Sequence, residues 1–184
     1  MFILASIPIG IILGLLLGGH IGAFASLRIR WAWLAVAGFV VQVLIFSDPV
    51  GSAVGSAGPA IYVASEVAVL AAVLRNLAIP GVAIIAIGAV GNLAAIIANG
   101  GRMPADPAAL RSAGLEVQGI TNSTVVADPV LRPLTDIFAI PAAVPFANVF
   151  SIGDVLIGIG IAATIAMAMR RGRQPSPGRA GGPL

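Results

Sequence analysis

Five long apolar runs, almost free of charged residues, constrain this chain more than any other feature. Of its 184 residues, 59% are hydrophobic and only 9% are charged, whereas about a quarter of the residues in a soluble domain are normally charged. The runs are continuous and show no apolar–polar alternation, which favours transmembrane helices over a β-barrel. The sequence therefore predicts an all-α, polytopic transmembrane helix bundle.

The runs predict five membrane-spanning helices within a single integral membrane domain of residues 1–171. Their predicted ranges are 2–23, 31–46, 59–74, 77–98 and 149–169. The second and third are short for a hydrocarbon core of about 30 Å. The first run has neither a basic segment before it nor a small-residue cleavage site, so we interpret it as a retained helix rather than a signal peptide.

The positions of the arginines predict the orientation of this bundle. Seven of them fall on one side of a five-span arrangement: Arg28, Arg30, Arg75, Arg170, Arg171, Arg173 and Arg179. The other three, Arg102, Arg111 and Arg132, share the opposite side with Asp48, Asp106, Glu116, Asp128 and Asp136. The positive-inside rule makes the first side cytoplasmic. We expect a cell-membrane protein with its N-terminus outside, its C-terminus in the cytoplasm and the bilayer, not nucleic acid, as its partner.

Two segments lie outside the predicted spans. The outer loop, residues 99–148, contains six prolines and predicts irregular structure on the membrane surface, apart from a short helix near 107–113 that Asp106 caps. The Pro/Gly-rich residues 172–184 predict a disordered cytoplasmic tail.

Small residues and the single histidine carry less information about function. Gly10, Gly14 and Gly18 repeat at four-residue spacing in the first predicted span, a pattern that lets helices pack closely. We expect this packing within the protomer, with contact between protomers as the alternative. The chain has no cysteine, and His20 is its one histidine, so we expect no metal or cofactor and interpret His20 as an interfacial polar residue.

Two polar residues lie inside predicted spans. Glu66 is near the middle of the third, where a charge is costly. It is either a functional group such as a proton relay or a neutral acid hydrogen-bonded to Gln42 or Asn92, and both readings stay open. Asn92, in the stretch GAVGNLAAIIANGG, is expected to hydrogen-bond to a neighbouring helix.

Asp136 and Asp154 form the most informative pair. Asp136 lies in LTDIF before the last span, and Asp154 lies in FSIGDVLIGIG within the first turns of that span. Eighteen positions and two prolines separate them, which allows the chain to fold back and bring the carboxyls together. Two carboxyl groups that share a proton form a dyad able to activate water against an amide. The simpler alternative is that Asp154 meets the positive end of the helix dipole and Asp136 is a loop residue.

The stretches GNLAAIIANGGRMP and NVFSIGDVLIGIG resemble a family of bacterial membrane proteins known as domain-of-unknown-function family 5317. The resemblance extends over nearly the whole chain. It implies a bacterial inner-membrane location and no assigned activity.

Over the last two predicted spans the chain is also similar, more distantly, to lipoprotein signal peptidase, an intramembrane aspartyl endopeptidase. That family has a GNL-type motif, then a V-D-F-type segment, then an N-x-A-D-type motif at the start of its last helix. The matching stretches here are Gly91-Asn92-Leu93, Thr135-Asp136-Ile137-Phe138 and Ser151-Ile152-Gly153-Asp154. The resemblance implies that Asp136 and Asp154 are catalytic, with Asn92 and Ser151 as supporting polar residues.

Three functions stay open. The chain is a structural or accessory membrane protein that contacts another membrane protein, an aspartyl hydrolase that acts on a membrane-anchored peptide through Asp136 and Asp154, or a small proton-linked carrier that uses Glu66. The first predicts that Asp136 and Asp154 lie far apart or face solvent. The second predicts carboxyls within hydrogen-bonding reach, and the third predicts a water-filled cavity that reaches Glu66.

Overall fold

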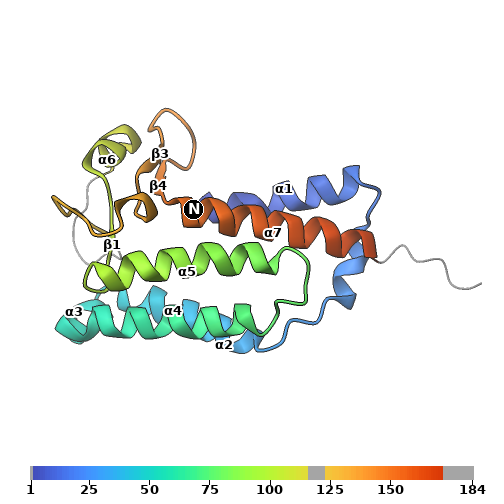
Figure 1. Ribbon diagram of the computed structural model, residues 1–184, viewed down its shortest axis with the longest axis horizontal. Coiled ribbons are helices and arrows are strands. Elements are labelled where there is room, and N and C mark those ends of the chain that lie inside the picture. The colour runs from blue at the N-terminus through green and yellow to red at the C-terminus, as the bar shows by residue number, and fades with distance from the viewer. Residues whose placement is uncertain (1, 116–122, 172–184) are drawn as a thin grey trace, which may run out of the picture.

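The computed structural model describes residues 2–115 and 123–171, and this part of the chain is mostly helical. Five helices run side by side along the long axis of the molecule (Figure 1). They are α1 (Phe2–Leu16), α2 (Ala32–Ile45), α4 (Gly58–Leu74), α5 (Val82–Ala98) and α7 (Ile152–Arg171). α7 packs against α1 and α5, while α4 packs against α2 and α5. The helices therefore neighbour one another in the order α2, α4, α5, α7, α1.

Several helices begin or end at residues other than those predicted. α1 stops at Leu16 rather than at residue 23, because Gly18 takes a positive φ of 76° and the turn closes with a hydrogen bond from Gly19 N to Gly14 O. A 3₁₀ helix, η1 (Ile21–Ser26), follows it. α5 begins at Val82 rather than at residue 77, after a turn in which Gly81 has a φ of 90°. The predicted tail of residues 172–184 lies outside the described residues.

Length and composition allow two of the described helical segments to cross a membrane: Val50–Leu74 and Ile152–Arg170. The first is longer than predicted because α3 (Val50–Val54) and the 3₁₀ turn η2 (Gly55–Ala57) run directly into α4. The other three long helices, α1, α2 and α5, are apolar but have 15, 14 and 17 residues. The buried share is 17% in the first segment and 39% in the second, which packs between α1 and α5.

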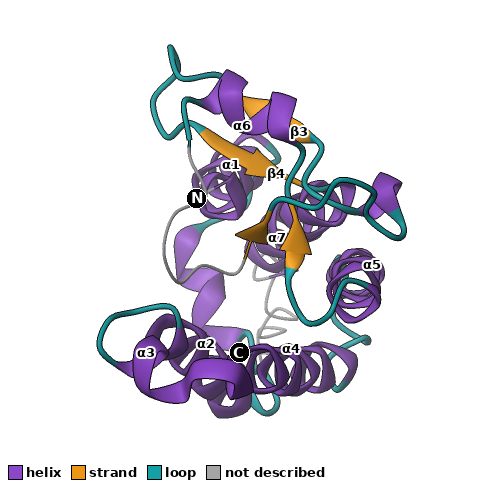
Figure 2. Ribbon diagram, turned by 90° about the vertical axis from the view of Figure 1, so that its left-hand side faces the viewer, coloured by secondary structure: helices purple, strands orange, loops and turns teal. Residues whose placement is uncertain are grey.

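The segment between α5 and α7 forms a small mixed structure at one end of the bundle, which we call the cap (residues 101–115 and 123–150). The expectation of an all-α chain is wrong here, because the cap contains two small sheets (Figure 2). β1 (Met103–Pro104) pairs in parallel with β2 (Ser123–Thr124), and β3 (Phe138–Ile140) pairs antiparallel with β4 (Asn148–Phe150). Such two- and three-residue pairings depend on tertiary contacts rather than on local sequence pattern.

The helix predicted in this segment is confirmed. α6 (Pro107–Ala113) begins after Asp106, whose carboxylate accepts hydrogen bonds from the backbone N–H groups of Ala108 and Ala109. Pro107 occupies the first helical position, where its missing N–H costs nothing. A 3₁₀ turn, η3 (Arg132–Leu134), follows later and leads into the strand hairpin β3–β4.

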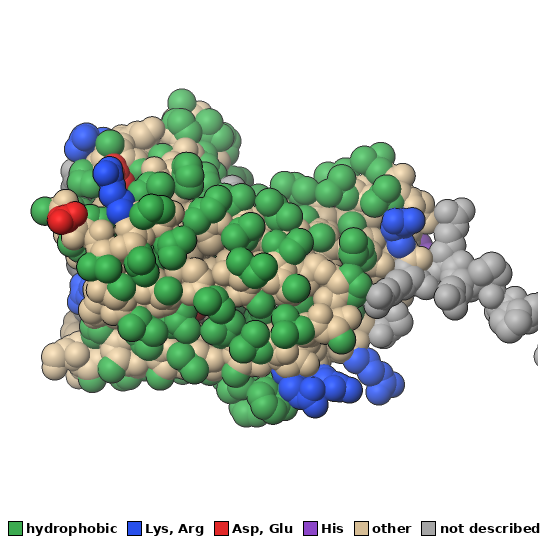
Figure 3. All heavy atoms as spheres, viewed as in Figure 1, with side chains coloured by type: hydrophobic (Ala, Val, Ile, Leu, Met, Phe, Trp, Pro, Cys, Tyr) green, Lys and Arg blue, Asp and Glu red, His purple; other side chains and the backbone are tan. Residues whose placement is uncertain are grey.

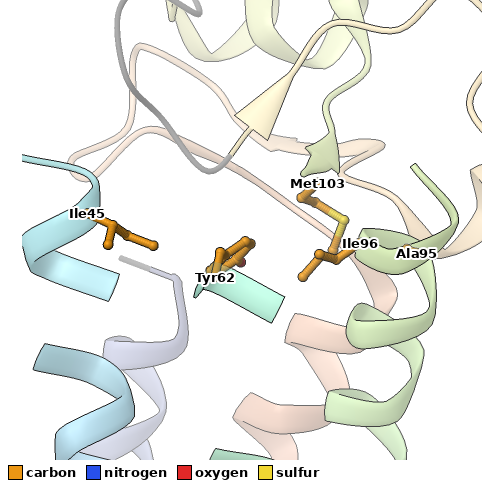
Figure 4. Close-up of a cluster of buried hydrophobic side chains, with 5 residues drawn as sticks. All are labelled: Ile45, Tyr62, Ala95, Ile96 and Met103. Atoms are coloured by element: carbon orange, nitrogen blue, oxygen red, sulfur yellow. The ribbon is translucent and has the colours of Figure 1, made fainter. Parts of the chain in front are cut away.

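A cluster of buried side chains attaches the cap to the bundle. Ile45, Tyr62, Ala95, Ile96 and Met103 come together from α2, α4, α5 and β1 (Figure 4). Phe46 packs edge-on against Tyr62, with ring centroids 5.1 Å apart. Leu134 of η3 packs against the same cluster, so the chain just before Asp136 is held on the ends of the helices.

Away from this cluster the surface is unusually apolar. Leucine, isoleucine, valine and phenylalanine side chains of α1 and α2 are widely exposed. In Figure 3, hydrophobic side chains cover the length of the visible face, and charged side chains gather at its two ends. Exposed apolar surface of this extent marks contact with a membrane or with another protein.

Candidate functional site

The start of α7 is built by a reciprocal pair of hydrogen bonds between Ser151 and Asp154. The Asp154 backbone N–H donates to Ser151 Oγ at 3.0 Å, and the Ser151 backbone N–H donates to Asp154 Oδ2 at 3.0 Å. This is a capping box, in which each side chain satisfies an N–H group that the helix leaves unpaired. The carboxylate also faces the positive end of the helix dipole. Asp154 therefore has a structural role whatever else it does.

Asn92 of α5 joins this capping box from the side. Its Nδ2 donates to Asp154 Oδ1 at 2.7 Å, and its Oδ1 accepts a hydrogen bond from Ser151 Oγ at 2.8 Å. Both ends of the amide are used, and both oxygens of the Asp154 carboxylate have an N–H donor. The expected hydrogen bond from Asn92 to another helix is thus present in the structure, with the start of α7 as its partner.

Two glycines make this contact possible. A Cβ on Gly153 would collide with the Asn92 side chain, and a Cβ on Gly88 would meet the backbone of Gly153. One heptad further along the same pair of helices, a Cβ on Gly160 would lie 2.9 Å from Gly81 O. α5 and α7 therefore approach backbone to backbone at two levels, as helices with small residues at their interface do. These glycines had no assigned role in the sequence analysis, although their spacing of seven, from 81 to 88 and from 153 to 160, is visible there.

Asp136 reaches the same region from the cap. Its backbone N–H donates to Pro104 O at 3.0 Å, and its carbonyl accepts from Asp106 N at 2.9 Å, so the residue is fixed beside the β1–α6 connection. Its side chain is 7% exposed. Within residues 2–115 and 123–171, no side-chain or backbone donor hydrogen-bonds to this carboxyl.

Burial raises the pKa of the Asp136 carboxyl from about 3.8 to about 7, and the negative charge of Asp154 adds to the shift. The two acids therefore lie near enough to interact by charge. In the described part of the chain they share no hydrogen bond, and both Asp154 oxygens are occupied by N–H donors. The Asp154 carboxyl is thus held by N–H donors, whereas the Asp136 carboxyl is largely desolvated and accepts no hydrogen bond from the described residues.

Glu66 lies in α4, further into the bundle. Its Oε1 accepts a hydrogen bond from Gln42 Nε2 of α2 at 3.2 Å, and Tyr62, one turn earlier on α4, also hydrogen-bonds to its carboxyl. Glu66 and Asp154 interact electrostatically. Of the two partners suggested by the sequence, Gln42 contacts Glu66 and Asn92 contacts Asp154. The sequence does not predict the contact with Tyr62, because a tyrosine in an apolar helix is usually a packing residue.

The three glycines of the first predicted span divide into two groups. Gly10 and Gly14 face α7, where a Cβ on Gly10 would lie 2.9 Å from the Ala162 backbone and one on Gly14 would overlap Met169. Gly18 lies beyond the end of α1 in a left-handed conformation and forms the turn instead. Gly10 and Gly14 thus pack against a helix of the same chain.

The described residues contain no group of three or more histidine, aspartate or glutamate side chains placed to hold a metal ion. His20 is exposed in the turn after α1, and its backbone N–H donates to Met169 O at 3.2 Å.

The site can now be set beside known proteins. The model of a family of unknown function, DUF5317, matches residues 26–166, which include Glu66, Asn92, Asp136 and Asp154. Neither curated proteins nor solved structures give a match. Since the matched region covers well over half of the sequence, the chain belongs to the DUF5317 family.

Proposed function

We propose that this chain is a multi-pass protein of the cell membrane in which α1, α2, the α3–α4 segment, α5 and α7 each cross the bilayer. The exposed apolar side chains along these helices support this arrangement. The cap lies outside, on the same side as the start of α1, and the C-terminal end of α7 is cytoplasmic. Arg28, Arg30, Arg75 and Arg170 all belong to the end of the bundle opposite the cap, as the positive-inside rule requires.

Three of these helices are short for a bilayer, because a 14-residue helix is only about 21 Å long at 1.5 Å per residue. Local thinning of the bilayer and flanking residues that reach the interface accommodate such a mismatch. The non-helical chain of the cap adds no such cost, because it lies outside the hydrocarbon, where backbone groups not paired in β1–β2 or β3–β4 can bond to water.

The topology is tested by labelling single cysteines, which is clean because the chain has none of its own. Ser112→Cys lies on exposed α6 of the cap, and Leu77→Cys is exposed at the opposite end. A membrane-impermeant maleimide should label the first and not the second in intact cells, and alkaline carbonate should fail to extract the protein. Labelling of Leu77→Cys, or release by carbonate, would contradict the proposal.

Within this frame, the site is proposed to be an acid–base pair at the outer face that hydrolyses an amide or ester of a membrane-anchored substrate. The observation that carries the proposal is the buried Asp136 carboxyl, which has no hydrogen-bond partner among the described residues and lies in the field of Asp154. Helix capping explains Asp154, whereas the Asp136 carboxyl receives no hydrogen bond from the described residues and its oxygens are not wholly shut off from solvent. Buried acids with perturbed pKa values concentrate at functional sites.

The chemistry follows from the different surroundings of the two acids. With a pKa of about 7, Asp136 carries a proton through much of the neutral range and can donate it to a substrate carbonyl oxygen. Asp154, whose partners are both N–H donors, accepts the proton that the attacking water loses. The hydroxyl adds to the carbonyl carbon to give a tetrahedral intermediate. As it collapses, Asp154 gives its proton to the departing nitrogen or oxygen and Asp136 takes back the proton from the former carbonyl oxygen, so the amine or alcohol leaves neutral and both acids are reset. In general, when two carboxyl groups lie in different surroundings, the one that keeps its proton acts as the acid and the other acts as the base.

The order of Asn92, Asp136 and Asp154 also agrees with the partial resemblance to lipoprotein signal peptidase, which favours a membrane-anchored peptide as substrate. Two departures limit the likeness: Ser151 stands where that family has asparagine, and Ala95-Ile96 stand where it has an Asp-Arg pair. In this structure Ser151 completes the capping box and donates to Asn92. The short hydroxyl side chain thus positions Asp154 through its own set of contacts.

Purified protein in detergent, incubated with fluorogenic lipid-anchored peptides, tests the activity. Asp136→Asn and Asp154→Asn should each abolish cleavage, whereas Asp128→Asn, at an exposed acid of the same cap, should leave it unchanged. The melting temperature of each variant shows whether loss of activity reflects loss of the fold. Absence of cleavage by the unaltered protein across a varied peptide set, or full activity of Asp136→Asn, would refute hydrolysis by this pair.

A structural or accessory role is the second candidate, and one observation favours it. Every hydrogen bond of Asp154 that the structure contains serves to start α7 or to fasten it to α5. On this reading the cluster only stabilises the bundle. It predicts that Asp136→Asn raises stability at neutral pH without changing the assembly of the protein with its membrane partners, which co-purification of the variant would measure.

A further inference from the structure

A pocket of about 360 Å³ lies at the end of the bundle opposite the cap, between α2, α4, α5 and α7. Leu27 and Ile29, from the extended chain between η1 and α2, form one side of it, and Ala35 of α2 lies on its wall. Its volume falls at the lower end of the range of about 300–1,000 Å³ that is typical of small-molecule sites. None of the acids discussed above contributes to its lining.

The pocket offers only hydrocarbon to an occupant. Its two polar lining residues, Asn76 and Thr164, are fully engaged in the protein. Thr164 Oγ1 donates to Gly160 O at 2.8 Å, and Asn76 Nδ2 donates to Ala72 O and Arg30 O, each at 2.7 Å. Because no polar group is left to orient a polar molecule, the part of a ligand that enters must be apolar.

The rim, by contrast, is strongly basic. Asn76 also accepts a hydrogen bond from Arg30 N at 2.8 Å, which fastens the linker before α2 to the end of α4. Arg28 and Arg30 of this linker and Arg75, next to Asn76, are exposed there. Leu27 and Ile29 line the pocket, and the exposed Arg28 stands between them in the chain, next to the lining.

These arginines have no acidic partner at their end of the molecule. The sequence contains no aspartate or glutamate from residue 1 to 47, from 67 to 105 or after 154. The one salt bridge of the described residues joins Arg132 to Asp106 in the cap. Figure 3 shows basic side chains gathered at this end without red ones beside them. An anion is the natural complement of such a rim.

Two tryptophans mark the depth of this rim. Trp31 and Trp33, 47% and 69% exposed, follow directly after Arg30. Tryptophan is enriched where the hydrocarbon meets the headgroups. Arginine and tryptophan together therefore place the rim at headgroup level and the pocket just inside the hydrocarbon.

We propose that this pocket binds an acyl chain of an anionic phospholipid of the cytoplasmic leaflet, whose phosphate contacts Arg28, Arg30 and Arg75. The proposal rests on the membrane topology proposed above and is independent of the hydrolase chemistry. The hydrocarbon lining selects the chain, and the unpaired arginines select the charge of the headgroup.

The protein carries its own reporter, because Trp31 and Trp33 are its only two tryptophans. Purified protein in detergent micelles is titrated with phosphatidylglycerol or phosphatidylcholine that carries bromine on its acyl chains, and quenching of tryptophan fluorescence is followed. The anionic lipid should reach half-maximal quenching at about a tenfold lower mole fraction than the zwitterionic lipid. Glycerol phosphate, which has the anion but no chain, should not compete.

Matched variants separate the two parts of the site. Arg28→Gln/Arg30→Gln/Arg75→Gln should remove the preference for phosphatidylglycerol, while Arg102→Gln/Arg111→Gln, at the cap end, should keep it. Ala35→Phe fills the pocket and should reduce quenching by the anionic lipid to the level of the zwitterionic one. Ala37→Phe, on the exposed surface of the same helix, should behave like the unaltered protein.

Equal quenching by both lipids in the unaltered protein would overturn the proposal. So would an unchanged preference in the triple arginine variant, or in Ala35→Phe. Competition by glycerol phosphate would show a simple anion site without a chain pocket and would overturn it as well. Failure of the topology is recognised separately, by reversed labelling of Ser112→Cys and Leu77→Cys, so the two proposals fail in different experiments.

Discussion

Asn92 and Asp154, 62 positions apart in the sequence, are joined by a hydrogen bond of 2.7 Å between Nδ2 and Oδ1. Through it, one amide side chain closes the start of α7 against the middle of α5. The amide serves Ser151 at the same time, so the three side chains form a single closed network. Networks of this kind respond to mutation as a unit.

A double-mutant cycle measures this coupling. Asn92→Ala should lower the free energy of unfolding in detergent by about 1–3 kcal/mol, because it removes the donor to Asp154 Oδ1 and the acceptor for the Ser151 hydroxyl proton. Combined with Asp154→Ala, the loss should be less than the sum of the single losses. Asn92→Ala with Asn99→Ala is the control and should be additive, since the Asn99 side chain bonds to the carbonyls of Ala95 and Val130 and to the N–H of Val130, none of which belongs to the network. Additivity in the first pair would exclude the network.

Two glycines on the same helix provide a matched test of the α5–α7 approach. Gly88→Ala should destabilise the protein by about 1–3 kcal/mol, because the new Cβ meets the backbone of α7. Gly91→Ala should be neutral or stabilising by up to about 1 kcal/mol, because the nearest atom to its Cβ is Leu134 Cδ2 at 3.9 Å and alanine favours the helix. Thermal unfolding in detergent compares the two, and equal effects would mean that the helices do not touch at Gly88.

The raised pKa of Asp136 predicts a pH dependence of stability. The folded protein holds this proton up to about pH 7, whereas the unfolded chain releases it near pH 4. Asp136 therefore contributes a free energy of unfolding that is complete below pH 4 and falls as the pH rises to about 7. Asp136→Asn should remove this slope, so its stability relative to the unaltered protein should rise between pH 5 and pH 8. Asp128→Asn should retain the slope, and the same slope in Asp136→Asn would contradict the assignment.

Loss of the side chain that caps α6 should lower the stability of this helix locally. Asp106→Ala removes the acceptor for Ala108 N and Ala109 N and should destabilise α6 by about 0.5–2 kcal/mol. Arg132→Gln, which breaks the salt bridge of a 68% exposed arginine, should have a much smaller effect. Amide hydrogen exchange resolved along the chain should show faster exchange in residues 107–113 for the first variant alone. Equal protection in both variants would show that Asp106 does not hold the helix.

The elements with clear local signals were the ones that the sequence predicted well. α2 was predicted as 31–46 and spans Ala32–Ile45. Asp106-Pro107 indicated the start of α6. The end of α1 was missed, because Gly18 lies in a continuous apolar run where a glycine equally suits helix packing. The strand pairs were missed for another reason: their two or three residues are held by partners far along the chain.

For the site, the sequence spacing identified two acids that do interact. It predicted that they share a proton directly, and it did not predict the hydrogen-bond network that holds one of them. Ser151-x-x-Asp154 matches the capping-box pattern. Because the predicted helix begins at residue 149, before Ser151, the sequence pattern does not identify Ser151 as the N-cap. Contact between Asn92 and Asp154 depends on the register of α5 against α7, which Gly88 and Gly153 set. Register between helices is a property of packing and leaves little trace in a single sequence.

α7 starts lower in the bundle than the end of its neighbour α5. The helix starts at Ile152 beside Asn92, which lies six residues, or about 9 Å, before the end of α5 at Ala98. Its first turn is thus recessed below its neighbour, and β4 leads into it from the cap. Side chains of the cap fill this step: Ser151 is fully buried, and Leu134 Cδ2 lies 3.9 Å from where a Cβ on Gly91 would stand. The first turn of α7 therefore lies beneath protein rather than against lipid, which lets a carboxylate stand at the start of an otherwise apolar helix.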